Sequence, residues 1–169
     1  MLNVNFAHFF FMSGHLEWAQ SLFDRYPNVR FDVTPGTEMY VDFSRRPKEF
    51  HDFFVKNQDR IFYGTDIIVR NAHYEDQMDE SVAWIHTLRR FFETKDTVDV
   101  HGESVTGIAL PEGVCRRLFV DNFMDFIGNC APKPVDSKAA AALCDGYMAV
   151  LPPGKEKTKE VLKSLREVL

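Results

Sequence analysis

Several features that mark common protein classes are scarce in this sequence. Cysteine occurs three times among 169 residues, at Cys115, Cys130 and Cys144, and never in Cys-x-x-Cys spacing. This pattern disfavours a disulfide framework or a cysteine-based zinc site and is typical of a cytoplasmic protein with reduced thiols. The longest apolar run near the N-terminus, residues 9–12, is too short to span a bilayer. We therefore expect neither a membrane span nor a secretory signal.

Positive charge is in deficit as well. The net charge is −5 and the pI is about 5.7, which argues against nucleic acid or an anionic membrane surface as a partner. No glycine-rich loop joins a predicted strand to a helix, which disfavours nucleotide binding. By contrast, hydrophobic residues make up 45% of the chain, and the 16 phenylalanines predict aromatic packing between layers of structure.

The first half of the chain alternates between two apolar patterns. Short apolar runs of strand length are separated by segments whose apolar residues lie three and four positions apart, as in amphipathic helices. This alternation predicts parallel strands joined by helical crossovers, an α/β fold. Ser13 is the predicted N-cap of the first helix. The predicted strands cover residues 4–11, 29–33 and 60–63, and the predicted helices cover 16–26, a segment opened by Pro47, and 79–93.

The second half of the chain is predicted to be helical. A helical region runs from residue 110 to 126, and prolines at 132–134 indicate a linker. Beyond it, an alanine-rich helix over 137–149 is separated from an amphipathic C-terminal helix by Pro-Pro-Gly at 152–154. We therefore divide the chain into a domain of residues 1–130 and a linker with C-terminal helices over 131–169.

Polar residues stand where the predicted strands end. Asp66 interrupts the apolar stretch RIFYGTDIIV, and a buried carboxylate is costly unless a partner meets it. It is either an N-cap or turn residue, or it faces a functional site. Asp32, at the end of the second strand, either binds loop amides or faces the same site. His8, on the first apolar run, is either a core histidine or an acid–base group.

Three segments resemble one known family. The family is that of the metal-dependent amidohydrolases. Its sixth and seventh strands are similar to Phe6-Ala7-His8 and residues 26–32, and its eighth strand is similar to RIFYGTD at 60–66. The helices that close its barrel are similar to residues 107–111 and 121–123. The resemblance is to the branch related to aminocarboxymuconate-semialdehyde decarboxylase. It covers roughly residues 3–128, in the same order and spacing.

The resemblance implies a (β/α)8 barrel with a divalent metal, most often zinc, at the carboxyl ends of its strands. In that pattern Asp66 is the eighth-strand metal ligand and proton acceptor, and His8 is the sixth-strand general acid/base or second ligand. His73 and Arg70 follow the eighth strand and are expected to bind the substrate; for Arg70 the alternative is a surface salt bridge. The implied reaction is the hydrolysis or decarboxylation of a small organic acid or amide.

Two features depart from the family pattern. None of the six histidines forms a His-x-His pair, and strands one to five of the barrel have no counterpart. A complete barrel of this kind takes roughly 250 residues. We therefore expect a partial barrel of about strands six to eight, either a truncated chain that lacks its N-terminal half or a half-barrel that forms a homo-oligomer. The alternative is a non-catalytic α/β remnant that serves as an interaction or oligomerisation module.

Overall fold

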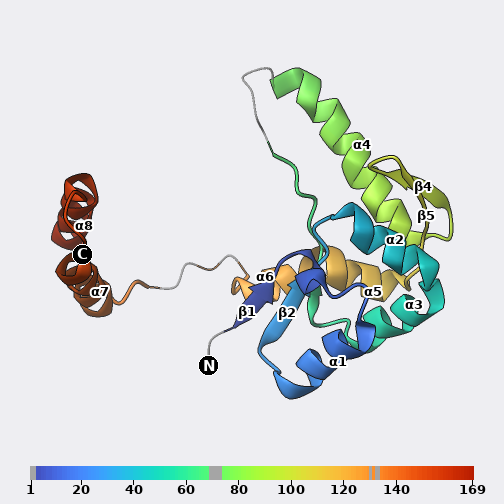
Figure 1. The fold of residues 1–169 in the computed structure, drawn as a ribbon, viewed down its shortest axis with the longest axis horizontal. Helices are drawn as coiled ribbons and strands as arrows, with labels where there is room; N and C mark the ends of the chain where they lie inside the picture. Colours follow the sequence, from blue (N-terminus) through green and yellow to red (C-terminus); the bar gives the residue numbers. More distant parts are fainter. Residues whose placement is uncertain (1–2, 69–73, 130, 132–133) are drawn as a thin grey trace. The chain divides into compact units, whose positions relative to one another are not determined.

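The computed structural model describes residues 3–68, 74–129, 131 and 134–169, without the side chains of 74–76 (Figure 1). The chain forms two compact units, Met1–Cys130 and Ala131–Leu169. In the described part of the chain, no helix is both long and apolar enough to cross a membrane.

The first unit is built on a small parallel sheet, as the alternating pattern predicted. Its three strands lie in the order β1-β2-β3, with Phe31 of the central strand paired to Phe6 on one side and Ile61 on the other. Helices in the crossovers pack their phenylalanines against the sheet. The described strands do not close into a barrel. The elements are β1 (Val4–Phe6), α1 (Leu16–Arg25), β2 (Val29–Asp32), α2 (Thr37–Arg45), α3 (Pro47–Lys56) and β3 (Ile61–Phe62).

The first predicted strand is too long. Strand β1 ends at Phe6, and residues 8–11 instead form a left-handed turn, η1 (His8–Phe11). The Ser13 cap is also wrong, because α1 begins at Leu16 and the Ser13 hydroxyl donates to Oδ2 of Asp42 over 2.8 Å. The apolar run at 9–11 looked like a strand because its side chains are hydrophobic, although its backbone is not extended.

Two further elements were missed by the sequence patterns. Helix α2 lies between the second predicted strand and the helix opened by Pro47, where the sequence patterns predicted no element. An antiparallel hairpin joins β4 (Thr97–Val100) to β5 (Glu103–Thr106), with Val98 opposite Val105. Its two turn residues, His101 and Gly102, both have positive φ, as tight hairpin turns require. The preceding helix, α4 (Tyr74–Glu93), begins earlier than the predicted residue 79.

The core of the first unit is aromatic, as the phenylalanine count predicted. Phe9 is fully buried at its centre, with edge-to-face contacts of 5.2 Å to both Phe31 and Phe43. Aromatic pairs in this geometry add to the free energy of burial. The rings come from the turn, the sheet and the helices, so they fix how these layers pack. The fully buried rings are Phe9, Phe31, Tyr40, Phe43, Phe50, Phe54, Phe91 and Phe92.

A helical segment covers the outer edge of β3. It consists of α5 (Glu112–Arg116), a π-helical turn η2 (Arg117–Asp121) and α6 (Asn122–Phe126), close to the predicted 110–126. The buried Asn122 amide donates to the carbonyls of Gln58 and Ile61, over 2.6 and 2.9 Å. The Tyr63 N–H donates to the carbonyl of Leu118 over 2.9 Å. At the other edge, β1 pairs only with β2 among the described strands.

The second unit is a helical hairpin. Asp136 caps α7 (Ser137–Val150) by accepting from the Ala139 N–H over 2.9 Å. A break at Pro152-Pro153-Gly154 separates it from α8 (Glu156–Val168), as predicted. Cys144 is the one buried residue of α7, and α8 has none. The hairpin therefore has almost no core of its own.

Candidate functional site

Three of the predicted site residues lie at or just beyond the ends of neighbouring strands of the parallel sheet. His8 comes two residues after β1, Asp32 is the last residue of β2, and Asp66 comes four residues after β3. The carboxyl ends of parallel strands meet at one edge of a sheet, which is where α/β proteins bind ligands. The topology therefore brings the three residues to the same edge.

Asp32 holds this edge together. Its Oδ1 accepts from the backbone N–H of His8 over 3.0 Å and from that of Thr34 over 3.1 Å. Its Oδ2 accepts from the side-chain amide of Asn5 over 2.7 Å. The residue is only 9% exposed, and these bonds replace the water that its carboxylate loses. Asp32 thus binds loop amides, one of the two roles considered from the sequence.

The His8 ring is held by a backbone carbonyl. Its Nδ1 lies 3.1 Å from the carbonyl oxygen of Thr34, and the ring stacks on Phe11 with centroids 5.6 Å apart. A carbonyl oxygen can only accept, so Nδ1 carries the hydrogen in this contact. In the neutral ring, Nε2 then carries the lone pair. His8 is half-buried at the sheet edge and is therefore not a core histidine.

The backbone around His8 is strained. Four consecutive non-glycine residues, His8–Phe11, have φ between 52° and 55°. Left-handed backbone costs an L-residue about 1–2 kcal/mol. The strain energy of the turn is offset by burial of Phe9 and by stacking of Phe10 on Phe6, with ring centroids 4.1 Å apart. Strain of this kind clusters at functional sites and motivates a functional hypothesis for the turn.

Asp66 has a different environment. It is exposed, has φ of 53°, and makes no hydrogen bond or ion pair within the described part of the chain. It is not an N-cap, because α4 begins only at Tyr74. Gly64 brings this segment against the loop after β2, since a Cβ at Gly64 would lie 2.1 Å from Oγ1 of Thr34. Asp66 is therefore a surface carboxylate beside the strand ends, and it is accessible to a ligand.

The two predicted substrate-binding residues, Arg70 and His73, lie outside the described residues. His15, the N-cap residue that precedes α1, stacks on Trp18, with ring centroids 4.4 Å apart. Over the described ranges, no group of three or more His, Cys, Asp or Glu side chains is placed to hold a metal ion.

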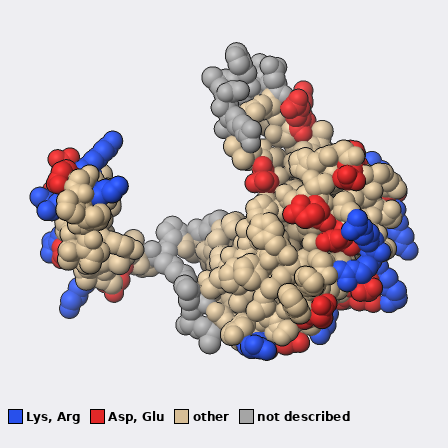
Figure 2. Space-filling view, in the orientation of Figure 1, with Lys and Arg blue, Asp and Glu red and all other residues tan. Residues whose placement is uncertain are grey.

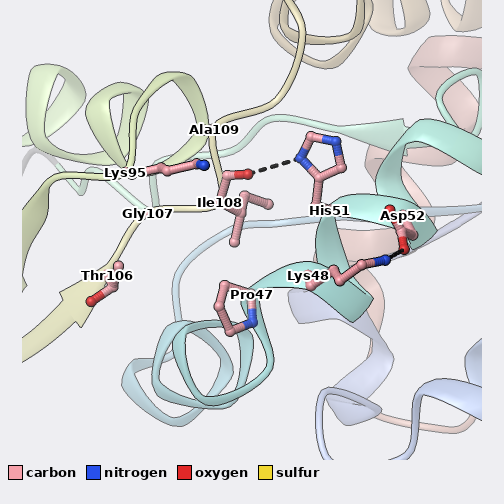
Figure 3. Close-up of a pocket in the computed structure, with 9 residues that line it drawn as sticks. All are labelled: Pro47, Lys48, His51, Asp52, Lys95, Thr106, Gly107, Ile108 and Ala109. Atoms are coloured by element: carbon pink, nitrogen blue, oxygen red, sulfur yellow. Dashed lines mark hydrogen bonds and ion pairs between the residues drawn. The ribbon is translucent and has the colours of Figure 1, made fainter.

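A separate hollow in the first unit was missed by sequence reasoning (Figure 3). It has a volume of about 580 Å³ and lies between the start of α3, Lys95 and the loop after β5. Its lining residues come from distant parts of the chain, and no motif links them. Only folding brings them together, so no sequence signal could have found the pocket. The lining consists of Pro47, Lys48, His51, Asp52, Lys95 and residues 106–109.

Comparisons with models of protein families, with curated proteins and with solved structures find no match to this chain. The α/β fold and the strand-end arrangement therefore rest on the residues and contacts described above.

Proposed function

We propose that the first unit supplies part of the active site of a metal-dependent hydrolase or decarboxylase acting on a small organic acid or amide. In this proposal β1, β2 and β3 correspond to strands six to eight of a (β/α)8 barrel of the amidohydrolase type. One observation carries it. His8, Asp32 and Asp66 follow the carboxyl ends of three neighbouring parallel strands, the edge at which such barrels hold their catalytic residues.

The proposed roles follow from the contacts of each residue. Asp66 is a metal ligand and proton acceptor, because its carboxylate is exposed and has no partner among the described residues. His8 is a general acid/base through Nε2, because Nδ1 is engaged by the Thr34 carbonyl. Asp32 positions His8 through the backbone. Arg70 and His73 are proposed to bind the substrate, Arg70 through a bidentate contact to a carboxylate.

The residues that the structure describes do not form a complete zinc site. Zinc in proteins takes three or four protein ligands, whereas no group of three metal-binding side chains occurs in the described ranges. The proposal therefore requires further ligands and strands from another segment or chain. Two observations support such an addition. Among the described strands, β1 has no partner at its outer edge, and the surface over β1 and α6 is largely uncharged (Figure 2).

Zinc content and zinc affinity test this proposal. The purified chain is assayed for bound metal and titrated with zinc, together with Asp66→Asn and the matched surface variant Asp24→Asn. We expect Asp66→Asn to weaken zinc binding by more than about tenfold and Asp24→Asn to leave it unchanged. Equal zinc affinity in the wild type, Asp66→Asn and Asp24→Asn contradicts the proposal.

The second candidate function, an interaction or oligomerisation module, is favoured by the second unit. Leu143, Tyr147 and Val150 form an exposed stripe along α7, and Val161, Leu165 and Val168 form one along α8. On each helix, a stripe residue immediately precedes a half-buried residue, and we take the half-buried residues to face the other helix. Examples are Tyr147 before Met148 and Val161 before Leu162. Because the helices are antiparallel, both stripes then fall on the same side of the hairpin.

A face of this kind is suited to a second hairpin. Two copies placed face to face make a four-helix bundle and bury both stripes. The mass in solution tests this candidate by light scattering. We expect Leu165→Glu to convert an oligomer to a monomer, whereas Lys159→Glu, on the opposite side of α8, leaves the mass unchanged. A wild-type monomer at high concentration contradicts it.

A further inference from the structure

The pocket between α3 and the loop after β5 has rigid walls. The N–H groups of Gly107, Ile108, Ala109 and Leu110 all donate to carbonyls at the end of α4 or just beyond it, over 2.7–3.0 Å. Gly107 makes this approach possible, since a Cβ there would lie 2.3 Å from the Thr94 carbonyl oxygen and 2.6 Å from that of Phe91. The loop is therefore fixed before any ligand arrives, which lowers the entropy cost of binding.

The opposite wall is tied to the same loop. His51, on α3, donates from Nδ1 to the carbonyl oxygen of Ile108 over 2.9 Å (Figure 3). At the end of β5, the Thr106 N–H donates to the Ser44 hydroxyl of α2 over 2.7 Å. These bonds hold three segments around one hollow. At about 580 Å³, its volume falls within the range of small-molecule sites in proteins.

The charges in the pocket are unequal. Lys48 and Asp52, on α3, form an ion pair over 2.7 Å, and hydrogen bonding to Lys48 lowers the pKa of the Asp52 carboxyl. Lys95, across the pocket in Figure 3, has no ion-pair partner among the described residues. One positive charge therefore remains unbalanced. The rest of the lining offers the apolar side chains of Pro47 and Ala109 and the methylene chains of the lysines.

We propose that this pocket binds the monoanion of a small organic acid, with its carboxylate at Lys95 and its apolar body between Pro47 and Ala109. Asp52 lies on the far wall and disfavours a second negative charge, so a monocarboxylate is preferred over a dicarboxylate. The loop amides are all engaged, so the carboxylate is recognised by side chains. The site shares no residue with the strand-end group and does not rest on the function proposed above.

Amide chemical shifts test this assignment on the intact chain. Hexanoate, 1-hexanol and adipate are titrated separately, each to about 20 mM, which is sufficient to saturate a millimolar site. We expect saturable shifts for hexanoate at the amides of Lys95 and residues 106–109, with weaker binding of the uncharged alcohol and of the dianion. Absence of saturable shifts at these amides, or equal binding of hexanoate and 1-hexanol, overturns the proposal.

A pair of lysine variants locates the carboxylate. Lys95→Gln removes the unpaired charge, and Lys56→Gln removes an exposed charge at the other end of α3. We expect the dissociation constant for hexanoate to rise by at least about threefold in Lys95→Gln, the range of an exposed charge contact, and to stay unchanged in Lys56→Gln. Equal weakening in both variants means that hexanoate responds to net charge alone, and it overturns the proposal. Both substitutions are at exposed positions, so neither is expected to unfold the chain.

Discussion

The backbone N–H of His8 donates to the Asp32 carboxylate over 3.0 Å, which joins the turn after the first strand to the end of the second. The same oxygen accepts from the Thr34 N–H, and the Thr34 carbonyl in turn receives Nδ1 of His8. The histidine is therefore held at both its backbone and its ring by neighbouring groups of β2 and the loop that follows it. Asp32 controls the position of His8 without touching the imidazole.

Loss of the Asp32 carboxylate is expected to destabilise the protein. In Asp32→Ala the N–H groups of His8 and Thr34 lose their acceptor while they stay partly buried. An unsatisfied buried donor costs about 1–3 kcal/mol, so we expect the free energy of unfolding to fall by about 2–4 kcal/mol. Urea denaturation measures it. The exposed Asp24→Ala variant is the control and should lose less than about 0.5 kcal/mol; equal losses would remove the special role of Asp32.

The left-handed turn predicts an unusual stabilising substitution. Phe11 has φ of 55° and is 73% exposed, so its side chain contributes little burial. Glycine adopts this backbone without strain, so Phe11→Gly is expected to be more stable than Phe11→Ala by about 1 kcal/mol. Both variants lose the same ring, and the comparison isolates the backbone term. A thermal melt in which the glycine variant is the less stable of the two would mean that the turn is not strained.

The sequence anticipated the sheet better than the turns. The alternation of strand and helix patterns predicted parallel strands, because each of these elements has a recognisable hydrophobic periodicity in the sequence. The hairpin was missed even though Val98 and Val100 show the two-residue alternation of a strand, since each of its strands is only four residues long. The turn at Phe9 was misread because burial, which the sequence does indicate, does not distinguish an extended from a left-handed backbone.

The strand-end group could be predicted only in part. Its residues were identifiable because polar side chains follow apolar strands at His8, Asp32 and Asp66. The contacts among them depend on loops meeting in three dimensions, so the bond from His8 to Thr34 had no sequence signal. For the same reason the pocket lined by Lys95 and His51 was not foreseen.

The close approach of Gly107 to α4 predicts a sharp contrast between two glycines. Gly107→Ala places a methyl group against two backbone carbonyls that cannot move without breaking the end of α4. Such overpacking is expected to cost about 1–3 kcal/mol or more. At Gly113, in helix α5, an added Cβ meets nothing within 4 Å, and alanine is expected to stabilise the helix by up to about 1 kcal/mol. Parallel urea denaturation curves should move in opposite directions.

Cys115 predicts a loss of stability in mild alkali. Burial raises the pKa of its thiol from 9.0 to about 11, because the charged thiolate is poorly solvated beside the Phe92 and Leu110 carbonyls. Between these values the unfolded chain has released a proton that the folded chain retains, so unfolding releases protons and becomes more favourable as the pH rises. The contribution is fully present below pH 9 and is lost between pH 9 and 11. We expect the free energy of unfolding to fall less steeply over this window in Cys115→Ala than in the wild type. Lys159→Ala, at an exposed position, is the control for general alkaline effects.

If the free energy of unfolding falls equally steeply with pH in Cys115→Ala and in the wild type, another group causes the alkaline loss of stability. Tyr63 is one such group, since burial raises its pKa to about 12.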